Sequence, residues 1–245
     1  MESKKNKPSW EIFLDGVHSG GGQWLNSFYH YGGACTAYLA SRLGLKPNHL
    51  TFISCGLIIL SMVLAVGMPG YGWMKAISVS SLLALSFVID CADGQLARAT
   101  NQTSKLGAWL DHLVDAWKVF IVNFSIGWLL LSESMIFEIS TPVAFLAMAL
   151  NISGSAIYFF AWNYKTMIAG KDLITKMTSK DTQKRHKIFR LAHEITDYAW
   201  IPFMYLLLAI PEKFATVYLY YGIVTFFIFM GYLIMSGNYM RKIKD

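Results

Sequence analysis

Charged side chains are scarce in this sequence. Asp, Glu, Lys and Arg together account for 15% of the residues, whereas apolar types account for 55%. Soluble domains usually contain about a quarter charged residues, so the deficit excludes an ordinary soluble domain and indicates that lipid surrounds much of the chain. One membrane domain is the simplest organisation for 245 residues.

Cysteine is also scarce, and no signal-peptide pattern is apparent at the start of the sequence. The cysteines Cys35, Cys55 and Cys91 lie in apolar or motif segments without CxxC spacing, so neither a disulfide framework nor a zinc site is indicated. The first residues contain no apolar core of signal-peptide length, so we expect no cleaved leader. No nucleic-acid recognition module is visible, and the basic residues behind the net charge of +6 are scattered. This distribution predicts contact with anionic membrane lipid rather than with nucleic acid.

The sequence does contain a series of long apolar runs. A membrane-spanning helix needs about 20 mainly apolar residues. The fifth of the candidate runs is short and ends at Pro211, so we expect it to form a helical hairpin with the sixth. The sequence therefore predicts an all-α integral membrane protein with six transmembrane helices. The six candidate runs are 48–67, 73–97, 104–132, 141–164, 198–211 and 214–236.

The segment before the first run has a different composition. Residues 24–46 are aromatic and semi-polar and include Gly32 and Gly33, which suits an amphipathic helix lying in the membrane interface. The alternative is a seventh, weakly hydrophobic span. We expect residues 1–46 to form a cytoplasmic segment with this interfacial helix, 47–240 the six-helix membrane domain, and 241–245 a cytoplasmic tail.

The positions of the basic residues predict the orientation. With the N-terminus in the cytoplasm and six spans, nearly all Lys and Arg fall on the cytoplasmic side. Only Lys75 and Lys213 lie on the outer side, and Lys118 lies within a span. Seven spans would put the termini on opposite sides and split the basic clusters. We therefore predict that both termini face the cytoplasm.

Four aspartates lie at the predicted cytoplasmic ends of the second and third runs. Asp90 and Asp93 are three residues apart, and Asp111 and Asp115 are four apart, so each pair shares one helix face. The loop between them, 99–103, is short and polar, which predicts antiparallel neighbouring helices and convergence of all four carboxylates. Ionisable groups at membrane depth are costly and usually functional.

Carboxylates gathered in this way must take up protons or bind cations. Oxygen ligands without an organised cysteine or histidine cluster favour Mg²⁺, Mn²⁺ or Ca²⁺ over zinc. Two ions would suit the displacement of a phosphoryl group. Arg98 follows Gly94 on the same helix and could hold a phosphate, and Gly107 leaves room one turn before Asp111.

The alternative is that these aspartates belong to a metal-ion or proton-coupled transporter. Their basic partners are few, namely Arg98, Lys105 and Lys118. A transporter would also need a through-path, ideally with internal repeats. The sequence contains no visible repeat, and the aspartates lie towards one membrane face. An enzyme is the better interpretation.

The motif that carries these residues resembles a known family. The pattern Asp90-x2-Asp93-Gly94-x2-Ala97-Arg98-x8-Gly107-x3-Asp111-x3-Asp115 matches the signature of the CDP-alcohol phosphotransferase (CDP-alcohol phosphatidyltransferase) family at every fixed position. Eight fixed residues at fixed spacing are highly specific. The segment Pro47-Asn48-His49-Leu50-Thr51 resembles the opening of the family's first span, and the resemblance covers roughly residues 46–236.

The resemblance implies a CDP-alcohol donor and a cytoplasm-facing cavity within a six-helix bundle. It also implies two divalent cations, Mg²⁺ or Mn²⁺, ligated by Asp90, Asp93, Asp111 and Asp115. Family analogy suggests a homodimer. The residues that it places around the CDP moiety are Asn48, Thr51, Gly94, Ala97, Arg98 and Gly107.

The expected reaction is attack by an acceptor hydroxyl on the β-phosphorus, with CMP leaving. The resemblance assigns Asp115 as the general base that accepts the hydroxyl proton. His112 is the rival base, because an imidazole titrates near neutrality. We favour a supporting hydrogen bond for His112, since consecutive residues on a helix point in different directions.

The identity of the alcohols is less well specified. The run from Ala97 to His112 resembles the choline/ethanolamine phosphotransferase branch, which favours a small CDP-alcohol and a lipid acceptor. The alternative is CDP-diacylglycerol with a small polar acceptor. Lys118 and Arg190 are candidate acceptor-binding residues. Lys118 could instead pair with an aspartate, and the basic segment 165–197 that includes Arg190 could instead reflect topology and contact with anionic lipid.

Overall fold

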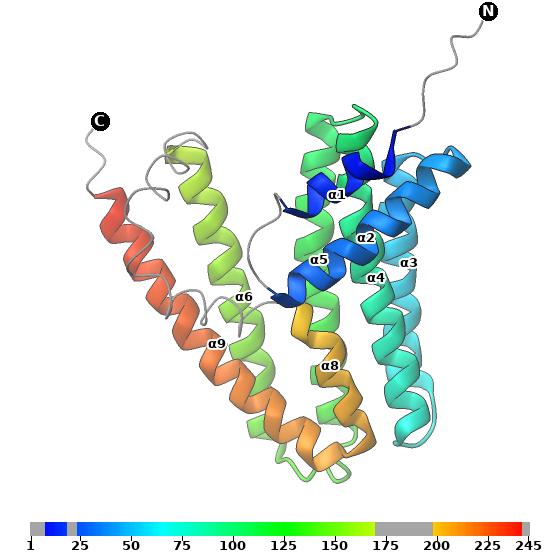
Figure 1. The fold of residues 1–245 in the computed structure, drawn as a ribbon. Coiled ribbons are helices and arrows are strands. Elements are labelled where there is room, and N and C mark those ends of the chain that lie inside the picture. Colours follow the sequence, from blue (N-terminus) through cyan, green and yellow to red (C-terminus); the bar gives the residue numbers. More distant parts are fainter. Residues whose placement is uncertain (1–7, 19–23, 170–197, 242–245) are drawn as a thin grey trace, which may run out of the picture. The chain divides into compact units, whose positions relative to one another are not determined.

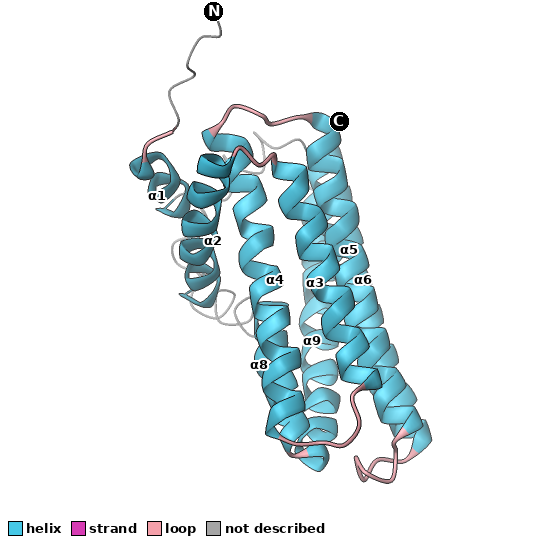
Figure 2. Ribbon diagram, turned by 90° about the vertical axis from the view of Figure 1, so that its right-hand side faces the viewer, coloured by secondary structure: helices cyan, strands magenta, loops and turns pink. Residues whose placement is uncertain are grey.

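The computed structural model describes residues 8–18, 24–169 and 198–241. Within these ranges all regular structure is helical and no strand occurs (Figure 2). Arg190 and the tail 242–245 lie outside the described residues. The helices are α1 (Trp10–His18), α2 (Trp24–Leu43), α3 (Pro47–Gly67), α4 (Trp73–Ala99), α5 (Lys105–Ser132), α6 (Thr141–Ala169), η1 (Tyr198–Trp200), α8 (Ile201–Leu206), η2 (Leu207–Ala209) and α9 (Pro211–Met240).

Five of the described helices are long and apolar enough to cross a membrane. They coincide with five of the six predicted runs, so the all-helical, multi-pass character is confirmed. The helix α2 is not among them. The candidate spans are Pro47–Gly67, Trp73–Ala99, Lys105–Ser132, Thr141–Ala161 and Pro211–Asn238.

The remaining predicted run, 198–211, has a different form. It contains the six-residue helix α8 between two short 3-10 turns, and the residues before 198 are outside the described part. The Ser80 hydroxyl of α4 donates a hydrogen bond to the Pro202 carbonyl at 2.6 Å. The helix α8 therefore packs on α4, and a count of six spans stays a prediction.

The chain divides into two compact units. The first comprises residues 1–118 and 201–209, and α4 is its central helix, packed against α2, α3 and α8. Serine hydroxyls allow α3 and α4 to approach closely, since Ser54 donates to the Ser86 carbonyl at 3.1 Å and Ser61 to the Val79 carbonyl at 2.8 Å. Small residues at such crossings are typical of membrane helices, whose contacts rely on close packing.

The helix α2 runs obliquely across the C-terminal half of α4 (Figure 1). At the crossing, a Cβ added to Gly33 would lie 2.9 Å from the Cys91 Cβ, so only glycine permits this approach. The Gln95 amide donates to the His30 carbonyl at 3.0 Å. The opposite face of α2 exposes apolar side chains, including Phe28. This two-sided character agrees with an interfacial helix, whose position at the membrane surface stays a prediction.

The second unit comprises residues 119–200 and 210–245, and its main packing is between α6 and α9. Among the residues of this unit that the structure describes, the buried polar groups are neutral. The Tyr218 hydroxyl donates to Asn123 Oδ1 at 2.9 Å, and Asn151 Nδ2 donates to the Tyr218 carbonyl at 3.2 Å. These bonds connect α5, α6 and α9. None of the four motif aspartates belongs to this unit, so the candidate site lies in the first.

Candidate metal centre

The loop between α4 and α5 brings the two halves of the motif together. It spans residues 100–104 and turns at Asn101, which has a φ of 55°, a left-handed value that asparagine tolerates. Ser104 then starts α5, since its Oγ accepts a hydrogen bond from the Gly107 N–H at 2.9 Å. The expected short polar connection is therefore present, one residue later than predicted.

The carboxylates meet in two overlapping groups. Asp90, Asp93 and Asp111 each offer an oxygen within 4.8 Å of the others. A second group has potential ligand atoms that also lie within 4.8 Å of one another, and it consists of Asp111, His112 and Asp115. Asp111 belongs to both. The structure thus brings together the four aspartates that the spacing predicts to converge.

This arrangement fits divalent cations. Ligand atoms bound octahedrally about 2.1 Å from Mg²⁺ lie about 3 to 4 Å apart, so three atoms within 4.8 Å need only a small contraction to share one ion. Carboxylate oxygens are the ligands that such hard cations prefer. Two groups with a shared member are what a pair of neighbouring ions would require.

Lys118 supplies a buried positive charge between the two helices. Its side chain is 3% exposed, and its ammonium forms an ion pair with Asp90 on α4 and, at 3.3 Å, with Asp115 on α5. Pairing with aspartate was the alternative to acceptor binding for this residue. One ammonium cannot neutralise four carboxylates, so protons or further cations are needed to complete the cluster.

Thr51 fixes one of the carboxylates. Its Oγ1 donates a hydrogen bond to Asp93 Oδ2 at 2.5 Å, and both side chains are buried. The bond joins the start of α3 to α4. The sequence suggested that Thr51 lies near the CDP moiety, and did not indicate this contact. Asn48, one turn earlier, is exposed.

The small residues of the motif lie close to polar side chains of the same region. The Arg98 guanidinium lies over Gly94, with one nitrogen 3.3 Å from the position that a Cβ would take. Arg98 is exposed and Ala97 is half-buried. A Cβ on Gly107 would meet only the Ser104 hydroxyl, at 3.1 Å. An exposed guanidinium held over Gly94 suits a phosphate-containing ligand.

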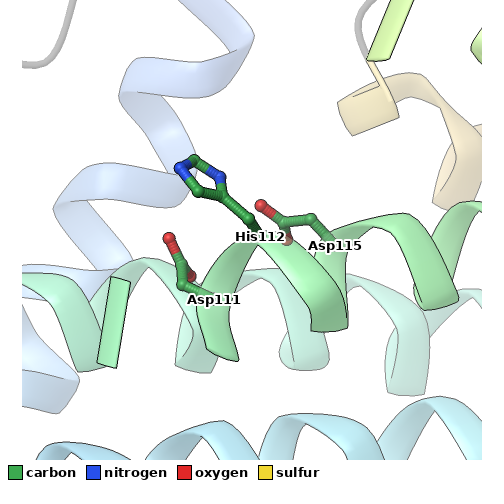
Figure 3. A group of neighbouring side chains, drawn as sticks. All are labelled: Asp111, His112 and Asp115. Atoms are coloured by element: carbon green, nitrogen blue, oxygen red, sulfur yellow. The ribbon is translucent and has the colours of Figure 1, made fainter. Parts of the chain in front are cut away.

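His112 lies closer to the carboxylates than the helix geometry suggested. We expected adjacent residues to point apart, but the imidazole shares the side of α5 occupied by Asp111 and Asp115 (Figure 3). The imidazole extends far enough from the helix axis to lie between Asp111, the preceding residue, and Asp115, three residues later. His112 is also exposed, so solvent and ligands can reach it.

The pairing of α2 with this region was not apparent from the sequence. Gln95 lies within the motif at a position that the family signature leaves variable, yet it is 2% exposed and binds His30. The one sequence feature related to this contact is the pair Gly32–Gly33. These glycines allow a close helix crossing, but the sequence does not indicate which helix is the partner. Polar partners between distant helices leave no such local pattern.

The chain is similar to proteins of known families. The sequence model of a family described as CDP-alcohol phosphatidyltransferase matches residues 45–240. An archaetidylinositol phosphate synthase of Aeropyrum pernix is 34% identical over 92 residues, which cover 37% of this chain and 44% of that protein. A bifunctional IPC transferase and DIPP synthase of Aquifex aeolicus is 35% identical over 83 residues, covering 34% of this chain and 17% of the relative.

Another archaetidylinositol phosphate synthase, from Pyrococcus horikoshii, is 33% identical over 75 residues, covering 31% of this chain and 37% of the relative. The chain thus matches less than half the length of each of these relatives. These similarities give no support to the transporter interpretation.

Proposed function

This chain belongs to the CDP-alcohol phosphatidyltransferase family, and we propose that it transfers a phospho-alcohol group from a CDP-alcohol to an acceptor alcohol. The acceptor oxygen forms a bond to the β-phosphorus, the bond from that phosphorus to the bridging oxygen breaks, and CMP leaves with the electron pair. The observation that supports this best is the meeting of four carboxylates from α4 and α5 in two overlapping groups. Members of this family are transferases of phosphate-containing groups.

Asp90, Asp93, Asp111 and Asp115 are the residues that would hold two divalent cations. Such ions, when bound, neutralise charge on the donor's diphosphate. The protein's own contribution is to fix the ligands in place. Thr51 holds Asp93 through its hydroxyl, and Lys118 holds Asp90 against Asp115. Ligands that are already oriented lose less entropy when they bind.

The remaining motif residues would bind the donor. The Arg98 guanidinium, exposed above Gly94, would pair with a phosphate oxygen. Asn48, Thr51, Ala97 and Gly107 would border the CMP moiety. Thr51 can serve here only with its oxygen lone pairs, because its proton is donated to Asp93.

Asp115 would accept the proton of the acceptor hydroxyl. Its side chain is half-exposed, which gives an acceptor access, and its contact with Lys118 at 3.3 Å keeps it oriented. His112 is the alternative base. Replacing Asp115 with Asn should abolish turnover while leaving donor binding largely intact. Full activity of that variant would remove Asp115 from the mechanism.

Two arrangements of donor and acceptor are candidates. We favour a small CDP-alcohol and a lipid acceptor, because the run from Ala97 to His112 resembles the choline/ethanolamine branch. The second candidate is a lipid CDP-donor and a small polar acceptor. The names of the similar synthases from Aeropyrum pernix and Pyrococcus horikoshii, which refer to archaetidylinositol phosphate, favour this second arrangement. Lys118 and Arg190 stay candidates for contact with the acceptor.

The site is proposed to face the cytoplasm together with both termini, since basic residues concentrate on that side. A homodimer is proposed from the family alone. Labelling of single cysteines introduced near residue 9 and at 138, with a reagent that cannot cross the membrane, would test the orientation. Outside labelling of the first position would contradict it.

The decisive assay measures CMP release by the purified full chain. CDP-choline, CDP-ethanolamine and CDP-diacylglycerol are each incubated with Mg²⁺ or Mn²⁺, with and without diacylglycerol or inositol phosphate. Release that requires a lipid acceptor supports the first arrangement, and release from CDP-diacylglycerol that requires a polar acceptor supports the second. Absence of acceptor-dependent CMP release from every donor would refute the proposed function.

A further inference from the structure

The two groups of potential ligands differ in chemistry. The group Asp90, Asp93 and Asp111 offers only oxygen, whereas the group Asp111, His112 and Asp115 includes an imidazole nitrogen. We propose that His112 is a direct ligand, so that the two cation positions are chemically distinct, one all-oxygen and one mixed. This inference rests on the divalent-cation site of the proposed function and adds a ligand that the four-aspartate motif does not contain.

The first support is the position of the ring. A ring nitrogen of His112 lies within 4.8 Å of a carboxylate oxygen of both Asp111 and Asp115, on the same side of α5 (Figure 3). Among the residues that the structure describes, none forms a hydrogen bond with this ring. The nitrogen lone pair is therefore not committed to a neighbouring N–H or O–H group of the described chain.

The second support is the spacing along the helix. His112 and Asp115 are three residues apart, a separation that puts two side chains on neighbouring positions of one helix face. In helical bundles that hold two metal ions, a carboxylate and a histidine three residues apart act as a chelating pair, there in the order Glu-x-x-His and here in the reverse order. Asp111 adds an oxygen from one turn before Asp115 and connects the mixed group to the all-oxygen group.

A mixed ligand set has a measurable consequence. Imidazole is a softer ligand than carboxylate, and Mg²⁺ binds it poorly, whereas transition metals accept it. The mixed position would therefore prefer Mn²⁺ to Mg²⁺. A histidine that acted only as a base or as a hydrogen-bond partner would not produce this preference, because it would not contact the ion.

The test uses Mn²⁺ as a spectroscopic probe on the purified full chain, without substrate. Pulsed electron paramagnetic resonance detects ¹⁴N coupled to bound Mn²⁺, and we expect this signal in the wild-type protein. Production of the protein with ¹⁵N-histidine should replace the ¹⁴N signal with a ¹⁵N signal. This measurement uses the wild-type protein, so its outcome does not depend on the folding of a variant. His112→Ala should remove the coupling.

The control is His49→Gln, which changes an exposed histidine near the start of α3. It should keep the nitrogen coupling. In titrations, His112→Ala should weaken Mn²⁺ binding at least about tenfold, since even indirect supporting groups of a metal site contribute about that much. Mg²⁺ binding should change much less.

Three results would overturn the inference: Mn²⁺ bound to the wild type without nitrogen coupling, coupling that persists in His112→Ala, or no Mn²⁺ binding. The first two can occur together with full CMP release, so they leave the proposed function standing. Nitrogen coupling without CMP release from any donor would instead refute the function and keep the ligand assignment.

Discussion

The polar groups on the two halves of α5 have different partners. The N-terminal half, in the first unit, carries Asp111, Asp115 and Lys118, whereas the C-terminal half, in the second unit, carries Asn123. In the second unit, amide and phenol groups pair with one another and with backbone carbonyls. In the first, one buried ammonium faces four carboxylates.

The difference separates a structural network from a functional one. A neutral network whose donors match its acceptors needs nothing from outside, and it fixes the arrangement of helices. A charged cluster with an excess of one sign is stable only if protons or cations complete it. Substitutions of the carboxylates in the first region should therefore affect catalysis more than folding, and those in the second region should affect folding more than catalysis.

The largest effect is expected for Asp111→Asn. Asp111 belongs to both ligand groups, so its loss weakens both cation positions together. We expect CMP release to fall at least about 10³-fold, because electrostatic stabilisation of phosphoryl transfer depends on both ions. The melting temperature should be unchanged or higher, since one of four like charges is removed. Activity within tenfold of wild type would contradict the two-group interpretation.

Lys118→Met should affect both stability and activity. Removal of the ammonium leaves Asp90 and Asp115 without their shared partner, and breaking a buried ion pair typically costs about 3 kcal/mol or more. The melting temperature of the variant should be lower than that of the wild type. Added Mg²⁺ should raise the melting temperature of the variant by more than it raises that of the wild type.

The matched control is Lys105→Met, which removes an exposed lysine from the first turn of the same helix and should change neither property. A Lys118→Met protein with wild-type stability and a raised KM for the acceptor alone would favour acceptor binding by Lys118 instead.

Thr51→Val should have a moderate effect. Valine has nearly the shape of threonine but cannot donate to Asp93, so the carboxylate loses its fixed orientation. Loss of a group that orients a metal ligand costs about 10- to 100-fold in metal affinity or activity, and we expect the lower end. Thr51→Ser keeps the hydroxyl and should retain most activity. Equal activity of the valine and serine variants would show that the hydrogen bond is unimportant.

The sequence predicted the long spans and the site better than it predicted the contacts around them. Apolar runs and the spacing of Asp90, Asp93, Asp111 and Asp115 depend only on local periodicity, and the structure agrees with both. The structure of the run 198–211 was harder to predict. A short apolar segment has the same composition whether it spans the lipid bilayer or packs on a neighbouring helix, as α8 does on α4.

Contacts between distant segments were not predictable. Thr51 and Asp93 are 42 residues apart, and nothing local indicates that their side chains meet. The direction of His112 was misjudged because helix periodicity places the Cα–Cβ bond but not the ring at its end. The periodicity of a helix therefore assigns residues to a face. The side-chain rotamers decide which residues on adjoining faces can bind the same ion.

The smallest effect is expected in the second unit. Tyr218→Phe removes the hydroxyl that donates to Asn123 but keeps the buried ring, which stacks with Phe214. Hydrogen bonds between membrane helices contribute about 0.6 kcal/mol on average, so the free energy of unfolding should fall by about that amount. CMP release should be unchanged. Tyr220→Phe is the control, since that side chain is 63% exposed on the same helix and should not alter stability. A large loss of activity in Tyr218→Phe, at unchanged stability, would show that the neutral network also serves the reaction and would end the division between the two regions.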